Sequence, residues 1–137
     1  MLLLLAHAAS TSALAGLVWV VQLVVYPGFR EVGPTHAWPA AHAAHSRRIS
    51  LTVGPPWMVQ AVTLALLLLR CDQPLWLLAL ASLCALTTVV MTVLVSVPLH
   101  ARLASYDDAV ARRLVRTNWW RTAAWTGSAA CALAMLS

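Results

Sequence analysis

The sequence predicts an all-α integral membrane protein, a single transmembrane domain of residues 1–137 that folds as a four-helix bundle with short interfacial helices on the cytoplasmic side. Three observations support this prediction. Of the 137 residues, 61% are hydrophobic, and only 9% are charged, whereas soluble domains carry about 25% charged residues. The apolar residues also gather into four stretches long enough to be membrane spans. A water-soluble bundle would need far more surface charge.

The first two spans are predicted at residues 2–25 and 51–69. At 1.5 Å per residue, the first span would reach roughly 35 Å, which is enough to cross the bilayer. We expect the Tyr26–Gly28 stretch to end it, because Pro and Gly both oppose helix continuation. In the second span, the Gly54–Pro56 stretch predicts a kink or a short re-entrant start, because proline removes a backbone donor.

The third and fourth spans are predicted at residues 75–97 and 119–136. Before the fourth span, carboxylates at residues 107 and 108 indicate a helix start, because negative charge favours the positive end of the helix dipole. The stretch 109–115 then has an amphipathic pattern and is expected to lie at the interface. A second interfacial helix is expected after Pro34, ahead of the second span.

The arginines predict the orientation of the bundle. Every one of the nine basic residues is Arg, and the formal net charge is +5. Eight arginines lie in or beside the two longer polar segments, residues 29–50 and 99–118: Arg30, Arg47, Arg48, Arg102, Arg112, Arg113, Arg116 and Arg121. By the positive-inside rule both segments are cytoplasmic and both termini lie outside. The lack of Lys and the abundance of Ala, Leu and Arg indicate GC-rich codons, hence a bacterial cytoplasmic membrane.

Neither the basic charge nor the cysteines suggest a soluble partner or a disulfide framework. No nucleic-acid-binding motif accompanies the arginines, so nucleic acid is excluded as a partner and the lipid bilayer is expected instead. The three cysteines, Cys71, Cys84 and Cys131, have no metal-motif or disulfide spacing. We interpret them as small apolar fillers.

Histidines from two segments are predicted to meet at the cytoplasmic end. His42 and His45 follow Trp38 on one helical face, and His100 ends a stripe of polar residues at successive i+4 steps along the third span. Imidazole is a common ligand for Zn, Cu and Fe. We therefore predict His42, His45 and His100 as metal ligands. A haem, a metal-free acid–base role and merely interfacial histidines stay open, because no carboxylate shares their helix.

Asn118 and Arg121 open the fourth span on one helical face. Arg121 either snorkels to headgroups or turns inward to hold an anionic or quinone-like oxygen. With His100 they are predicted as catalytic residues: the imidazole would move protons, and Asn118 and Arg121 would stabilise negative charge on a substrate oxygen. Gln22, Tyr26 and Gln60 offer further polar groups inside the spans, where each needs a partner or a purpose.

These strings carry a resemblance. Asn118-Trp119-Trp120-Arg121-Thr122-Ala123-Ala124-Trp125 opens the last span, the Tyr26-Pro27 pair follows the first, and His42-Ala43-Ala44-His45-Ser46-Arg47-Arg48-Ile49 precedes the second. The chain resembles small four-span bacterial membrane proteins related to anthrone oxygenases. In the arrangement of its spans, the resemblance covers most of the chain. The specific sequence motifs that support it cover about a quarter of the residues. It implies a four-helix membrane bundle and, for characterised members, oxygenation of an anthrone to a quinone, with His42, His45, His100, Asn118 and Arg121 as site residues.

The sequence therefore favours a membrane oxidoreductase or oxygenase that acts on an apolar aromatic or quinone-like substrate through its histidine cluster. Its partners would be the lipid bilayer and a lipophilic small molecule, and a homo-oligomer stays open. The alternative is a non-enzymatic ligand-binding or assembly subunit with interfacial histidines. A transporter is disfavoured, because the spans hold no carboxylate and show no repeat.

Overall fold

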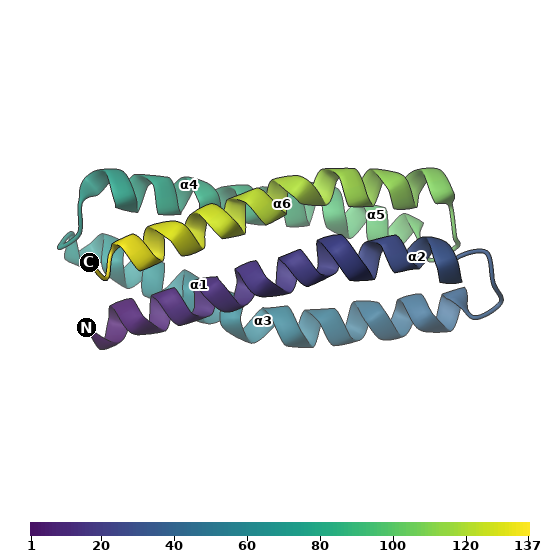
Figure 1. Cartoon of the computed structure of the whole chain (residues 1–137), viewed down its shortest axis with the longest axis horizontal. Helices are drawn as coiled ribbons and strands as arrows, with labels where there is room; N and C mark the ends of the chain where they lie inside the picture. Colours follow the sequence, from purple (N-terminus) through teal and green to yellow (C-terminus); the bar gives the residue numbers. More distant parts are fainter.

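The computed structural model describes residues 1–137 and consists of helices without strands. Four long helical segments run side by side along one axis and form a bundle (Figure 1). Three segments are long and apolar enough to cross a membrane: Leu2–Val32, Trp38–Arg70 and Leu75–Arg102. The fourth, α6 (Asp108–Ala134), is of similar length, but arginines crowd its first half. The prediction of an all-α protein is therefore confirmed, with three helical segments that have the length and apolarity of membrane spans.

The two ends of the bundle differ in charge. Both chain termini lie at one end, together with the short turn between α3 (Trp38–Arg70) and α4 (Leu75–Met91). The connections at residues 33–37 and 103–107 lie at the opposite end (Figure 1). We call this second end the arginine end, because the two arginine-rich polar segments meet there, as the sequence predicted.

Two π-helical turns carry the first and third segments past prolines. The first segment comprises α1 (Leu2–Val20), the π turn η1 (Val21–Val25) and α2 (Tyr26–Val32). The prediction that the first helix ends at Tyr26–Gly28 is therefore wrong. A proline ring clashes with the carbonyl four residues earlier in an α-helix, and the wider i→i+5 turn of η1 relieves this clash just before Pro27.

The third segment also has a π turn just before a proline. It comprises α4, the π turn η2 (Thr92–Ser96) and α5 (Val97–Arg102), with Pro98 at the start of α5. A proline in the first turn of a helix loses no intrahelical hydrogen bond. Both segments therefore continue to the arginine end, and the side chains that follow the π turns reach its interior.

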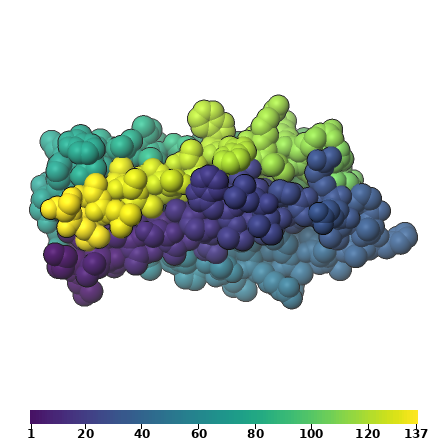
Figure 2. All heavy atoms as spheres, in the orientation of Figure 1, coloured from purple at the N-terminus to yellow at the C-terminus, as the bar shows by residue number.

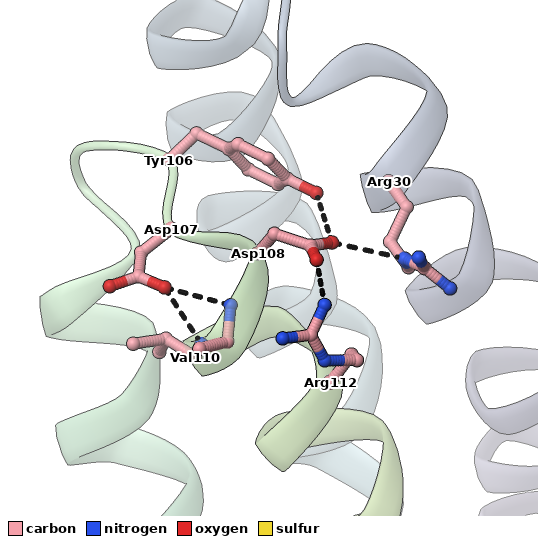
Figure 3. A network of polar contacts seen from close by, with 7 residues as sticks. Arg30, Tyr106, Asp107, Asp108, Val110 and Arg112 are labelled. Atoms are coloured by element: carbon pink, nitrogen blue, oxygen red, sulfur yellow. Dashed lines mark hydrogen bonds and ion pairs between the residues drawn. The ribbon is translucent and has the colours of Figure 1, made fainter.

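The two predicted interfacial helices are not separate elements. The first is fused with the second span in α3, an uninterrupted helix of 33 residues with Pro55 and Pro56 inside it. The predicted re-entrant start is therefore wrong, although Figure 1 shows α3 changing direction near its middle. The second is fused with the predicted fourth span in α6, which is not among the three segments apolar enough to cross a membrane. The predicted start of α6 is confirmed: the Asp107 carboxylate accepts hydrogen bonds from the amides of Ala109 and Val110 at 2.8 and 3.1 Å (Figure 3).

The bundle buries polar side chains and exposes apolar ones. Gln60 is 1% exposed and Asn118 is fully buried, whereas Leu69 is 82% exposed. Apolar clusters still fill each part of the interior, with Trp38 and Leu103 at the arginine end and Leu67 and Leu78 near the termini. A soluble protein would reverse this pattern, and a protein in lipid keeps its polar groups paired inside.

Gly33 permits a close approach that fixes the arginine end. A side-chain carbon at this position would overlap the Tyr106 ring. The Tyr106 hydroxyl donates a hydrogen bond of 3.1 Å to Asp108, which also accepts one from Arg30 at 3.1 Å (Figure 3). This network ties α2 to the start of α6.

Gly33→Ala is expected to lower the free energy of unfolding by about 1–3 kcal/mol, because the added methyl group must displace the Tyr106 ring. Thermal unfolding of the detergent-solubilised protein would measure the loss. Gly28→Ala is the matched control: a carbon added there meets no atom within 4 Å, so its unfolding temperature should not fall. Equal unfolding temperatures for the two variants would contradict the tight packing at Gly33.

Candidate functional site

Three histidines meet inside the arginine end. His42 and His45 lie in the first turns of α3, and His100 lies in α5. The Nε2 atom of His42 is hydrogen-bonded to Nδ1 of His100 at 3.2 Å. The His45 ring stacks on the His100 ring with centroids 5.8 Å apart and an interplanar angle of 25°. The structure thus brings together the three histidines that the sequence singled out.

Tyr26 extends the hydrogen-bonded chain to the other side of His100. Its hydroxyl oxygen lies 3.1 Å from the Nε2 atom of His100. The chain therefore runs from Tyr26 through both ring nitrogens of His100 to His42. Aromatic neighbours hold the rings in place: Trp38 stacks on His42 at 5.0 Å, and Phe29 meets His45 edge-on at 4.9 Å.

This geometry does not fit a three-histidine metal centre. Ligating nitrogens must all point at one ion and lie near 2.0–2.1 Å from it if the ion is zinc. Here the nitrogens of His42 and His100 point at each other, and the second nitrogen of His100 is bonded to Tyr26. No group of three or more His, Cys, Asp or Glu side chains forms a metal-holding set. Metal or haem ligation by His42, His45 and His100 stays a prediction of the sequence.

Asn118 and Arg121 belong to a second polar network. The Asn118 amide donates a 2.8 Å hydrogen bond to Gln22, and its oxygen accepts one of 3.1 Å from Arg121. Arg121 also donates to Ser96 at 3.3 Å, and its guanidinium lies 5.0 Å from the centre of the Trp125 ring. Asn118 therefore links Gln22 to Arg121, and it does not line the cavity described next.

A cavity of about 420 Å³ lies between these two networks. Its polar wall consists of Tyr26, Ser46, Thr92, Ser96, His100 and Arg121. The remaining wall is mostly apolar and includes Val18, Val21, Ile49, Val53, Trp57 and Trp125. Ligand sites commonly have this composition, an apolar lining with a few convergent polar groups.

Three residues of the cavity wall each have a buried polar atom without a hydrogen-bond partner: Ser46 Oγ, Thr92 Oγ1 and Arg121 Nε. A buried donor without a partner costs about 1–3 kcal/mol. A bound molecule with an oxygen acceptor would relieve this cost. Residues with unpaired polar atoms therefore gather at the cavity.

The cavity reaches the surface through one side of the bundle. Ser50 and Gly54 of α3 and Val97 of α5 line the cavity and are also exposed. These residues stand on two segments that flank the opening. Entry of a ligand between α3 and α5 would therefore not require passage through either end of the bundle.

The other polar residues noted in the sequence lie outside this site. His36 is exposed in the connection before α3. His7 is buried near the termini, where its Nδ1 atom is hydrogen-bonded to Thr63 at 2.8 Å. Gln60 donates to Ser128 at 2.9 Å and does not line the cavity. Tyr26 is the site residue for which the sequence predicted no role, although its i+4 spacing from Gln22 placed both on one face.

Comparison of the chain with protein-family models, with curated proteins and with solved structures finds no match.

Proposed function

We propose that this chain is a membrane-embedded oxidoreductase of the oxygenase type that binds an apolar aromatic or quinone-like molecule in the cavity. One observation carries the proposal: three residues that line a largely apolar cavity, Arg121, Thr92 and Ser46, each have a buried polar atom without a hydrogen-bond partner. An aromatic ketone or quinone has an apolar body and a carbonyl oxygen. Its body would contact the apolar wall of the cavity, and its oxygen would accept hydrogen bonds from the polar wall.

The proposal includes a place in the membrane. The bundle would span a bacterial cytoplasmic membrane with the arginine end in the cytoplasm and both termini outside. The exposed apolar surface and the three apolar helices support this placement. In this orientation the opening between α3 and α5 faces lipid, and a lipophilic substrate would enter from the bilayer.

Binding would orient the substrate by its oxygen. Arg121 Nε would donate to the carbonyl oxygen, while Trp57 and Trp125 would contact the ring system; their own rings meet edge-on at 5.8 Å. Asn118 would act as a positioning residue, since it fixes the guanidinium through a 3.1 Å hydrogen bond. The cation would then stabilise negative charge as it develops on the oxygen.

The Tyr26–His100–His42 chain would move the proton. If the Tyr26 hydroxyl donates to His100 Nε2, the His100 proton lies on Nδ1 and is donated to His42 Nε2. A proton taken from the substrate by the Tyr26 oxygen would then shift each proton one step, and His42 would become cationic. The three groups act as a relay of general acid–base catalysis without a metal.

With an anthrone as the substrate the reaction balances with molecular oxygen as the oxidant. The relay takes a proton from the carbon opposite the carbonyl, and the negative charge spreads to the oxygen held by Arg121. The carbanion forms a C–O bond with O₂, which gives a peroxide that is protonated. Loss of water leaves a second carbonyl, so that anthrone and O₂ become anthraquinone and water.

Ser50→Phe is expected to weaken the binding of a hydroxyanthraquinone at least about tenfold, because the new ring would block the opening of the cavity. Thr52→Phe is the matched control. Both residues are exposed on α3, and both hydroxyls donate 2.8 Å hydrogen bonds to the carbonyl four residues earlier. Thr52 does not line the cavity, so its variant should bind like the parent.

Fluorescence titration of the purified protein in detergent would measure both dissociation constants. Equal affinities for the two variants and the parent would contradict the assignment of the cavity as the binding site. Binding without turnover would favour the non-enzymatic ligand-binding subunit instead.

A further inference from the structure

A second hollow lies on the outside of the arginine end, between α2 and the first half of α6. It is an open groove of about 1230 Å³. Its walls are formed by Pro27 and Arg30 of α2 and by Arg113, Arg116 and Trp119 of α6. Figure 2 shows the two helices side by side on the viewed face, α2 in dark blue and this part of α6 in green. The groove shares no lining residue with the cavity.

The arginines of the groove exceed its carboxylates. Asp108 serves two of them: it accepts a 3.1 Å hydrogen bond from Arg30 and pairs with Arg112 (Figure 3). These are the two ion pairs of the structure. Arg113 and Arg116 therefore line the groove without a carboxylate partner. Glu31 is the other acidic residue of the lining, so the groove keeps a net positive charge.

The spacing of these arginines is unfavourable without an anion. Arg112 and Arg116 are four residues apart on α6, and Arg113 and Arg116 are three apart. Like charges that are neighbours on one helix face repel each other and destabilise the helix. A bound anion would turn this repulsion into attraction, and guanidinium groups bind phosphate through paired N–H donors.

From the arginines of the groove toward the middle of the bundle, the surface becomes apolar and aromatic. Trp119 is 46% exposed and meets Trp19 edge-on at 5.6 Å. On the neighbouring segment, Leu23 is 59% exposed and lies one turn before Pro27 of the groove. Tryptophans mark the headgroup level of a membrane protein. A molecule with an anionic head and an apolar tail therefore matches both parts of the surface.

We propose that this groove binds an anionic phospholipid. Its phosphate contacts Arg113 and Arg116, and its acyl chains lie along Trp19, Trp119 and Leu23. Inorganic phosphate has the same charged group but lacks the chains, so it binds far more weakly. The proposal depends on the membrane placement and does not depend on the oxidoreductase activity.

The test measures binding of phosphatidylglycerol to the full-length protein in detergent micelles, by native mass spectrometry. The variant Arg113→Gln with Arg116→Gln should bind at least about tenfold more weakly. The matched control is Arg47→Gln with Arg48→Gln, which removes the same charge from two exposed arginines of α3 at the same end. The control pair does not line the groove and should bind like the parent.

Three results would overturn the proposal. An equal loss in the two double variants would show that only net charge matters. Equal binding of phosphatidylcholine by the parent would show that the groove does not select an anionic headgroup. Displacement of the lipid by an equal concentration of inorganic phosphate would identify a free-phosphate site instead.

Discussion

His100→Phe should lower the turnover number about 10²–10⁴-fold, the usual contribution of general acid–base catalysis. In the proposed proton relay His100 is the central member, with Tyr26 on one ring nitrogen and His42 on the other, at 3.1 and 3.2 Å. Phenylalanine keeps an aromatic ring against Phe29 and His45 but has no nitrogen to pass a proton. The cavity keeps its shape, so the dissociation constant of the hydroxyanthraquinone should change by less than about threefold.

His36→Phe is the control for this variant, because His36 is an exposed histidine at the same end and lies outside the site. Initial rates of aerobic anthrone oxidation, read from quinone absorbance, would measure both proteins. The relay would be excluded if His100→Phe oxidised anthrone as fast as His36→Phe.

Arg121→Met should lower the turnover number about 10²–10³-fold, which is the effect of removing one donor to a developing oxyanion. Methionine fills a similar volume but offers neither the charge nor the Nε donor of Arg121, a residue that lines the cavity. The substitution also leaves the Asn118 oxygen without its 3.1 Å donor. A fall in unfolding temperature is therefore expected as well, and the rate must be measured well below that temperature.

Arg102→Met supplies the matched control, since Arg102 is an exposed arginine of α5 and does not line the cavity. Arg121→Lys restores the charge without the planar fork and should recover part of the lost rate. A folded Arg121→Met protein with the rate of Arg102→Met would remove Arg121 from the mechanism.

The sequence predicted the helices well where the apolar residues were continuous. It failed at the prolines, because a π turn has no sequence signal that distinguishes it from a helix end. Pro27 was therefore interpreted as the end of the first helix, whereas η1 carries the chain on through α2. The i+4 spacing places Tyr26 on one face with Gln22, but it does not predict the contact of Tyr26 with His100.

Convergence of the histidines followed from two simple features of the sequence. The i, i+3 spacing places His42 and His45 near one helical face, and the arginine count assigns their segment and that of His100 to one end. The directions of the ring nitrogens could not be predicted in this way, because they depend on packing against Trp38 and Phe29. The hydrogen-bond partner of Asn118 could not be predicted from the sequence either, because Gln22 lies 96 residues away in the chain.

Oxygen consumption by the purified parent protein with anthrone tests the proposed oxygenase activity most directly. The assay compares O₂ uptake with anthraquinone formation, above the rate of anthrone oxidation in protein-free detergent. We predict saturable kinetics with one O₂ consumed for each quinone formed, and loss of the protein-dependent rate in His100→Phe. A parent protein that binds hydroxyanthraquinone in the cavity but oxidises anthrone no faster than detergent alone would contradict the oxygenase and leave a ligand-binding subunit.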